Sequence, residues 1–260
     1  MRIIRYQHKH ESVKFGWVLE DPAGPLVGPI EGSPFGDFQR LEANLPLEQV
    51  KLIHPVSPSK ILCIARNYAA HAKEHNSPVP DVPMLFLKPP SSLIGPGETI
   101  ILPPQSQQIE HEAELAVVIG KPGRWISPEQ ALDHIFGYTI ANDVTARDLQ
   151  RRDGQWGRAK GFDTFCPLGP WIETDFDPSD SLITCNVNGE MRQMASTRDM
   201  VFSIRQLIAF ISSVMTLDTG DILLTGTPAG VGSLLPGDQV EIIIEGIGTL
   251  TNPVQAEAPR

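Results

Sequence analysis

The sequence predicts a mixed, β-dominated fold with a few short helices, and three observations support this prediction. Short apolar runs recur along the whole chain, as expected for many short strands. The 24 prolines and 22 glycines among 260 residues interrupt these runs and supply frequent turns. Clear helical patterns are few. We therefore expect one large domain built mainly from strands, with a smaller appendage.

The first part of the chain reads as a small β-rich N-terminal domain over residues 1–57. Residues 2–6, 15–20 and 26–30 alternate in polarity and are separated by turn residues, which is typical of half-buried strands. The run ends at His54 in a proline-rich stretch that reaches Pro58. We place a boundary there, so that residues 58–260 form a second, larger domain.

Beyond the boundary, residues 60–65 read as a buried strand. Asn67 is placed to cap a short helix that runs to His75, and Pro78 stops it. Ser127 is expected to cap a helix over residues 127–134, and residues 203–214 carry apolar side chains at helical spacing. The other expected strands are residues 85–87, 99–102, 115–119, 136–141, 222–224 and 240–244.

Composition narrows the classes of partner. The formal net charge of -10 and the lack of a lysine and arginine cluster argue against nucleic acid and against an anionic membrane surface, so small molecules are expected. Cys63, Cys166 and Cys185 are odd in number and far apart, which favours buried, reduced thiols and a cytoplasmic location. We find no secretion signal and no apolar stretch approaching the ~20 residues that span a bilayer.

Glu112 and Glu114 are the most informative residues. They lie two positions apart in an apolar run, and residues two apart in a strand point to the same face. Two buried carboxylates repel each other and lose hydration, so a divalent cation is a good way to keep both charged. The alternative is an ordinary strand face exposed to solvent.

Asp143 ends the next apolar run and is placed to join this pair. If residues 144–152 are helical, Gln150 lies about two turns further along nearly the same face. Oxygen ligands alone select a hard cation, Mg²⁺ or Mn²⁺ with Ca²⁺ as a third option, whereas zinc prefers histidine or cysteine. His111 neighbours Glu112 and would face away from the acids. A plain helix cap is the alternative role for Asp143.

Three further segments are candidates for chemistry. His71 and Glu74 are three residues apart in the expected short helix, so the carboxylate can orient the imidazole as an acid/base pair, although a partly exposed pair fits as well. Lys160 precedes a turn and is either a functional residue of a site or a loop residue without such a role. Residues 225–233 form a glycine-rich loop that lacks the lysine of a phosphate loop, which leaves a tight turn or a carboxylate-binding loop.

Together these segments resemble the fumarylacetoacetate hydrolase family. The resemblance covers the chain from about residue 58 to its end, in order and spacing. It rests on residues 66–71 (RNYAAH), 86–90 (FLKPP), 112–120 (EAELAVVIG), 142–148 (NDVTARD), 160–164 (KGFDT) and 225–228 (TGTP). The chain is similar to the short bacterial members of the family, such as 2-hydroxyhepta-2,4-diene-1,7-dioate isomerase, which acts in aromatic catabolism, and acylpyruvate hydrolase.

The resemblance implies a β-roll fold, usually in a homodimer. It also implies Mg²⁺ or Mn²⁺ on Glu112, Glu114 and Asp143, with Gln150 and Lys160 near the metal and substrate. Thr227 would hold the substrate carboxylate. His71 and Glu74 would lie on a lid that orders when substrate binds. Arg66 can pair with a distal substrate carboxylate, which favours a diacid; a purely structural role is the alternative.

The chemistry of a 2-oxo acid agrees with this implication. Such an acid chelates a divalent ion through its carboxylate and 2-oxo oxygens, and the cation stabilises the enolate that forms. Hydrolysis of a C–C bond, tautomerisation and decarboxylation all share this enolate. We expect an isomerase or C–C bond hydrolase of a 2-oxo or 2-hydroxydienoate diacid. The alternatives are an oxaloacetate decarboxylase or keto-enol tautomerase, and a non-catalytic, metal-dependent binder of 2-oxo acids.

Overall fold

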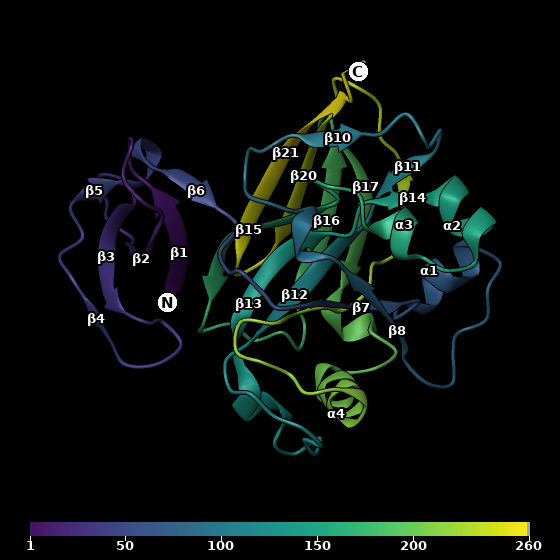
Figure 1. The fold of residues 1–260 in the computed structure, drawn as a ribbon, viewed down its shortest axis with the longest axis horizontal. Coiled ribbons are helices and arrows are strands. Elements are labelled where there is room, and N and C mark those ends of the chain that lie inside the picture. Colours follow the sequence, from purple (N-terminus) through teal and green to yellow (C-terminus); the bar gives the residue numbers. More distant parts are fainter. Residues whose placement is uncertain (259–260) are drawn as a thin grey trace.

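The structure is a computed structural model that describes residues 1–258, and its strands far outnumber its helices (Figure 1). The β-dominated class is therefore confirmed. The first six strands form a lobe at the left of Figure 1. They are β1 (Arg2–Gln7), β2 (Lys14–Leu19), β3 (Leu26–Gly32), β4 (Phe38–Arg40), β5 (Leu45–Pro46) and β6 (Lys51–Ile53), with a 3-10 turn at Leu47–Gln49.

The lobe is continuous with a large sheet whose strands run in the order β4-β3-β2-β1-β15-β13-β12-β18-β7-β8. The strands of this sheet outside the lobe are β7 (Ile61–Ala65), β8 (Met84–Lys88), β12 (Ala113–Ile119), β13 (Ile135–Asn142), β15 (Cys166–Glu173) and β18 (Ile222–Leu224). The short β9 (Leu93–Ile94) pairs with β15. Strand β18 lies between β12 and β7, antiparallel to the first and parallel to the second.

A five-stranded sheet packs against this one, and a three-stranded sheet lies beside them. The five-stranded sheet contains β10 (Ile100–Leu102), β21 (Gly248–Ala256), β20 (Gln239–Ile244), β16 (Leu182–Val187) and β17 (Glu190–Ser196); the three-stranded sheet contains β14 (Thr145–Ala146), β11 (Ile109–His111) and β19 (Gly232–Ser233). Side chains of β12 such as Leu115 share one apolar core with Ile242 and Ile244 of β20.

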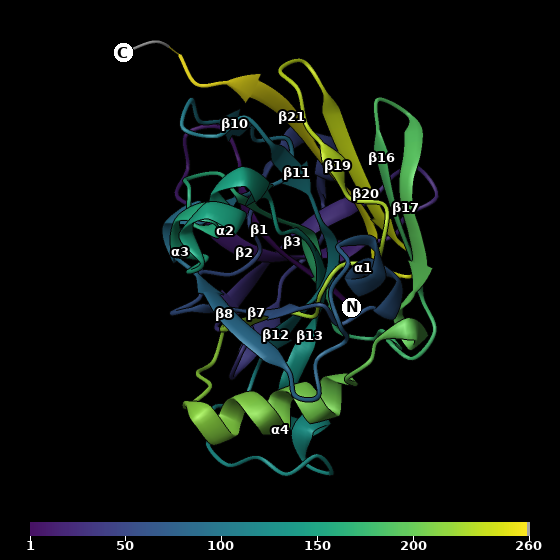
Figure 2. The same ribbon diagram turned by 90° about the vertical axis from the view of Figure 1, so that its right-hand side faces the viewer.

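The described residues contain four α-helices: α1 (Ala69–Glu74), α2 (Arg147–Asp153), α3 (Gly157–Lys160) and α4 (Ile204–Val214). Figure 2 shows α4 below the sheets, far from α2 and α3. The expected helix over residues 203–214 is confirmed, and Ser203 Oγ accepts a hydrogen bond from the Gln206 N–H as its cap. None of the described helices is long and apolar enough to cross a bilayer.

One predicted helix and one predicted helix cap are wrong. Residues 127–134 form only a 3-10 turn at Ala131–His134, whose two buried residues, Ala131 and His134, are three positions apart as that helix requires. The other short 3-10 turns are Pro90–Ser92 and Thr197–Asp199. Helix α1 exists, but Asn67 does not cap it, because its side chain bonds instead to Thr225 and Phe202.

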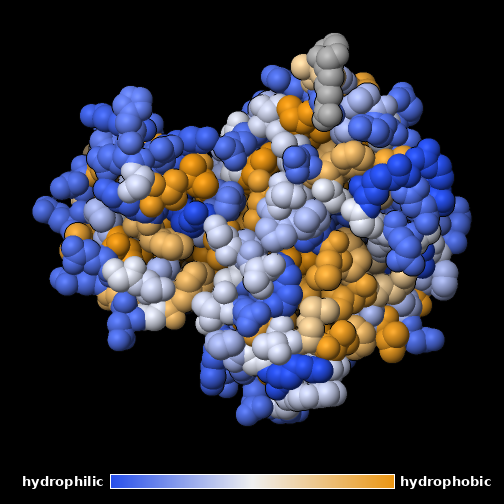
Figure 3. Space-filling view, in the orientation of Figure 1, coloured by the Kyte–Doolittle hydropathy of each residue, from blue (hydrophilic) through white to orange (hydrophobic). Residues whose placement is uncertain are grey.

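The surface has two different halves in Figure 3. Hydrophilic side chains dominate the outer edge of the N-terminal lobe, whereas apolar side chains gather over the region where β7 and β8 lie. Leu87 of β8 is an exposed apolar residue, with 46% of its surface accessible. All three cysteines are free and buried, as expected from the sequence.

Candidate active site and cation site

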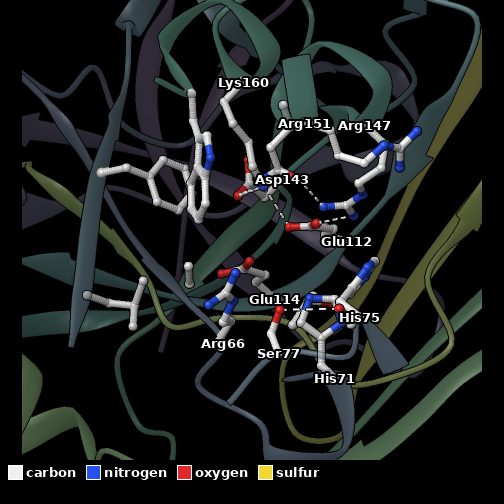
Figure 4. Close-up of a pocket in the computed structure, with 16 residues that line it drawn as sticks. Arg66, His71, His75, Ser77, Glu112, Glu114, Asp143, Arg147, Arg151 and Lys160 are labelled. Carbon is white, nitrogen blue, oxygen red and sulfur yellow. Dashed lines mark hydrogen bonds and ion pairs between the residues drawn. The ribbon is translucent and has the colours of Figure 1, made fainter. Parts of the chain in front are cut away.

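A cavity of about 250 Å³ lies where β7 and β8 meet the break between β11 and β12 (Figure 4). Helices α1, α2 and α3 line its sides. Most of its lining is polar or charged, which suits an anionic organic substrate rather than an apolar ligand. The predicted site residues that line it are Arg66, His71, Glu112, Glu114, Asp143, Gln150, Lys160 and Thr227, whereas Glu74 is not part of the lining.

Three carboxylates converge at the floor of this cavity. Glu112 lies in the break between β11 and β12, Glu114 is in β12, and Asp143 directly follows β13. The pairing of Ala113 with Asn142 sets β12 and β13 in register, and the Asp143 N–H donates to the Glu112 carbonyl at 2.9 Å. Oxygens from the three side chains lie within 4.8 Å of one another, and all three residues are buried. The solvent-exposed alternative for the acid pair is therefore wrong.

Asp143 is not a helix cap either, because α2 begins at Arg147. It instead ends a strand beside two other acids, as the sequence led us to expect. The same late start of α2 removes the argument that set Gln150 two helical turns from Asp143. Gln150 nevertheless lines the cavity, and its Oε1 accepts a hydrogen bond of 2.7 Å from Arg147.

Three buried cations surround two of the acids. Lys160 Nζ lies 2.7 Å from Glu112 and 2.6 Å from Asp143, and Lys88 Nζ lies 2.6 Å from the other oxygen of Asp143. Arg147 bridges Glu112, at 2.5 Å, and Glu110, at 2.8 Å. Burial alone would raise the pKa of Glu112, but Lys160 and Arg147 outweigh it and hold that pKa well below its usual range. These two cations therefore favour the ionised form of Glu112.

Glu114 is in the opposite situation. Burial, together with the nearby charges of Asp143 and Glu112, raises its pKa well above its ordinary value. One of its oxygens accepts a 2.6 Å hydrogen bond from the Gly226 N–H, and within residues 1–258 it has no ion pair. A divalent cation among the three carboxylates would remove this penalty. The donor set of buried oxygens fits Mg²⁺ or Mn²⁺ for this reason.

Helix α1 places His71 on the opposite wall of the cavity. His71 Nδ1 lies 3.4 Å from Glu74 Oε2, so the two predicted partners are adjacent, but without hydrogen-bond geometry. Burial lowers the pKa of His71, and the charge of Glu112 opposes this only in part. The imidazole is therefore neutral near pH 7 and carries a lone pair that can accept a proton.

Arg66 and Thr227 occupy the rim of the acid cluster (Figure 4 labels Arg66). Arg66 has a φ of 57°, a left-handed conformation that is strained for a residue with a Cβ, and no partner for its guanidinium is found within residues 1–258. Thr227 Oγ1 donates to the Ala113 carbonyl at 2.9 Å. Its hydroxyl proton therefore already has an acceptor.

Sequence reasoning missed three residues that hold this site together. Lys88 and Arg147 lie inside the segments 86–90 and 142–148 that carried the resemblance, so their motifs were a signal that we did not use. Gln193 gave no signal. It is fully buried, accepts from the Ala113 N–H at 3.1 Å, and donates to Thr227 Oγ1 at 2.8 Å, which joins the strand of the acids to the Thr227 loop.

Two family models match the chain. The model described as "Fumarylacetoacetate (FAA) hydrolase C-terminal" matches residues 60–255, and the model described as "Rv2993c-like, N-terminal" matches residues 1–55. Among curated proteins, Protein Rv2993c of Mycobacterium tuberculosis is 48% identical over 91% of this chain and 90% of its own length. A mitochondrial oxaloacetate tautomerase of Bos taurus is 47% identical over 81% of this chain and 71% of its own length.

Solved structures agree with these matches. A 5-carboxymethyl-2-hydroxymuconate delta-isomerase from Mycobacterium smegmatis is 46% identical, with a TM-score of 0.92 over 99% of this chain and 100% of its own. A 2-hydroxyhepta-2,4-diene-1,7-dioate isomerase from Mycobacterium marinum is 44% identical, with a TM-score of 0.92 over the full length of both chains. A maleylpyruvate hydrolase from Sphingobium, solved with manganese and pyruvate, is 32% identical, with a TM-score of 0.80 over 99% of this chain and 100% of its own.

Proposed function

This chain is an enzyme of the fumarylacetoacetate hydrolase family, and we propose that it moves a proton in a 2-oxo or 2-hydroxydienoate diacid, in the manner of an isomerase, with Mg²⁺ or Mn²⁺ as its cofactor. The observation that carries the proposal is the position of Lys160. Its buried ammonium group touches both Glu112 and Asp143, so it fixes a positive charge beside the three carboxylates. An enolate oxygen that forms there gains charge stabilisation that the ground-state carbonyl does not need.

The cofactor would be held by Glu112, Glu114 and Asp143. When bound, it would supply a Lewis acid that polarises the 2-oxo group of the substrate. Lys160 adds its own charge on the same side. Without a cation, burial and the negative charges of Asp143 and Glu112 disfavour ionisation of Glu114, and its pKa is raised for this reason.

The proton would be moved by His71. Its ring lines the cavity opposite the carboxylates, and its lowered pKa leaves it neutral and able to accept a proton from substrate carbon. Glu74 is close enough to stabilise the imidazolium that results. If His71 instead activated a water molecule, the same site would hydrolyse a C–C bond. Ordering of α1 over bound substrate would bring Glu74 into hydrogen-bond geometry.

Arg66 favours a diacid over a simple 2-oxo acid. Its guanidinium has no partner within residues 1–258 and reaches the cavity from a strained backbone, so it is available for the second carboxylate. The backbone of the Thr227 loop would receive the carboxylate next to the 2-oxo group. The 47% identity to an oxaloacetate tautomerase supports oxaloacetate, also a 2-oxo diacid, as a second candidate substrate.

Two further features belong to this proposal. A homodimer is expected from the family resemblance, and the apolar surface around β8 offers a face for a second copy. A cytoplasmic location is expected from the three reduced, buried cysteines. The division into residues 1–57 and 58–260 is likewise retained as a proposal.

The test is product analysis with metal-depleted protein. We would add Mg²⁺ or Mn²⁺ and follow 2-hydroxyhepta-2,4-diene-1,7-dioate, oxaloacetate and acetylpyruvate by NMR in D₂O. Deuterium incorporation at C5 of the dienoate, or at C3 of oxaloacetate or acetylpyruvate, that depends on the cation and is lost in Lys160→Met would support proton transfer through an enolate. Cleavage of acetylpyruvate would assign hydrolysis instead. Binding of all three compounds with no exchange and no product would contradict an enzymatic role for this site with this substrate class.

A further inference from the structure

Helix α1 carries a second group of potential metal ligands beside the carboxylate site. His71 and Glu74 lie in α1 and His75 is its C-cap residue, so the three occupy positions i, i+3 and i+4, which fall on one face of a helical turn. One ligand atom from each lies within 4.8 Å of the others. The two imidazole rings are in contact, with centroids 4.7 Å apart. The order His-x-x-Glu-His is one in which two histidines of a helix can hold zinc.

The hydrogen bonds of these residues leave ligand atoms free. His71 Nδ1 and His75 Nε2 are both buried, and neither has a hydrogen-bond partner within residues 1–258. A buried polar nitrogen without a partner carries a free-energy penalty, so two of them in one cluster call for an explanation. Glu74, in turn, is held in place by the Gly230 N–H, which lies 3.1 and 3.2 Å from its two oxygens.

We propose that His71, Glu74 and His75 form a second cation site, selective for a borderline transition-metal ion such as Zn²⁺. Two imidazole nitrogens and one carboxylate are a zinc-type donor set with a fourth position open, whereas Mg²⁺ prefers oxygen ligands. With Zn–N distances of about 2.0–2.1 Å, tetrahedral ligand atoms are about 3.3 Å apart. Side-chain rotation has to bring the ligand atoms of His71, Glu74 and His75, which now lie within 4.8 Å of one another, to this tetrahedral spacing.

Occupancy of this site has a consequence for activity, and this part rests on the proposed function. Zn²⁺ on His71 would take the lone pair that accepts the proton from substrate. The two cation sites would then act in opposite directions, the carboxylate site activating the enzyme and the histidine site inhibiting it. His75 takes no part in the proposed proton transfer, but its ring lines the same cavity and contacts His71. His75→Gln should therefore remove the inhibition, and its turnover without Zn²⁺ is measured as the reference.

The experiment first measures binding without any activity. In a Glu114→Gln background, which disables the carboxylate site, Zn²⁺ is titrated against a chromophoric chelator. One equivalent should bind. Adding His75→Gln should weaken binding by about tenfold or more, because one imidazole ligand is lost. Adding His10→Gln, which removes an exposed histidine elsewhere, should change nothing. Equal Zn²⁺ affinity in the His75 variant would overturn the proposal.

Imidazole ¹⁵N NMR of the same protein identifies the ligands directly. Zn²⁺ should shift the resonances of two histidines, and those two should be absent from His71→Gln and His75→Gln spectra respectively. Thermal melting of each variant without metal confirms that it is folded. In activity assays with Mg²⁺, the wild type should be inhibited by Zn²⁺ and His75→Gln should resist. If no substrate is turned over, the binding and NMR results still decide whether the site exists.

Discussion

At the scale of single residues, Glu114 and Glu112 show how one cavity gives two neighbouring carboxylates opposite protonation behaviour. Both are buried on the same side of the chain, but Glu112 touches Lys160 and Arg147 while Glu114 touches a backbone N–H. Burial penalises the charged form of each, and the cations reverse this penalty for Glu112 alone. The energetic cost of ionisation therefore falls on Glu114, and a bound cation would reduce that cost.

This arrangement predicts an unusual dependence of stability on pH in metal-free protein. The pKa of Glu114 is raised in the folded state, so above the unfolded-state pKa the folded protein holds a proton that the unfolded chain has lost. Its contribution to stability is fully present at acidic pH and falls as pH rises. Glu114→Gln should remove this loss, so its free energy of unfolding should gain on the wild type by up to about 1.4 kcal/mol per pH unit.

Urea denaturation of both proteins from pH 5 to 8, in the presence of a chelator, measures this difference. An exposed substitution, Glu31→Gln, serves as control and should keep a constant difference from the wild type. A Glu114→Gln protein that is less stable than the wild type at every pH, by an amount that does not change, would show that Glu114 is ionised in the folded protein without metal.

At the scale of elements, the acids and the histidine helix are held together by bonds between distant segments. Asn67 follows β7 and is fully buried; its side chain bonds to the Thr225 carbonyl, at 2.8 Å, and to both the carbonyl and the N–H of Phe202. It thereby fixes the start of α1 against the loop that carries Thr227 and against the entry to α4.

Asn67→Ala should therefore cost stability as well as activity. The change leaves buried backbone groups of Thr225 and Phe202 without partners, and we expect a loss of about 3 kcal/mol in the free energy of unfolding. Denaturant unfolding measures it. The exposed Asn44→Ala is the matched control and should stay within about 0.5 kcal/mol of the wild type. A loss of similar size in both variants would mean that the Asn67 bonds add nothing specific.

Asn67 also illustrates which parts of the structure a sequence can predict. Strands such as β7, β12 and β18 were predicted because alternation, burial and turn residues are local properties, and α4 was predicted from its cap and its apolar spacing. Asn67 was read as a cap because capping is the local option for an asparagine before a helix. Its actual partners are 135 and 158 positions away. Local patterns carry no information on such pairs.

The same limit applies to the candidate site. Glu112, Glu114 and Asp143 could be selected because acids within apolar runs are conspicuous, and His71 with Glu74 because of helical spacing. Lys160 was ambiguous, since only the fold shows that its ammonium reaches residues 17 and 48 positions away. The sequence around Gln193 shows only a polar residue in a strand, and its role follows from the contact between β17 and the Thr227 loop. A role that depends on tertiary packing cannot be predicted from a local pattern.

At the scale of the whole molecule, cation binding and catalysis should be separable. If the carboxylates hold Mg²⁺ in the folded state and the unfolded chain does not, a concentration of 100 times Kd should stabilise the protein by about 2.7 kcal/mol. His71→Ala should keep this stabilisation and lose turnover, because His71 belongs to α1 and not to the carboxylate cluster. Glu114→Gln should lose both.

Thermal shift with and without Mg²⁺, combined with turnover of the best substrate, tests this separation. Lys51→Ala, which removes an exposed ion pair with Glu98, is a control expected to keep both properties. Loss of the Mg²⁺ response in His71→Ala would place the histidine in the cation site and contradict the division of roles between the two walls of the cavity.

The position of β18 has a consequence for how the protein is made. Strands β12 and β13 are neighbours along the chain, so the acids can be brought together early, whereas β7, with Arg66 and α1 just beyond it, reaches β12 only through β18 at Ile222–Leu224. Most of the polypeptide must leave the ribosome before that strand can insert. The acids and the histidine therefore meet late in synthesis, and a nascent or truncated chain that stops before β18 has both halves of the site but lacks the strand that pairs with both β12 and β7.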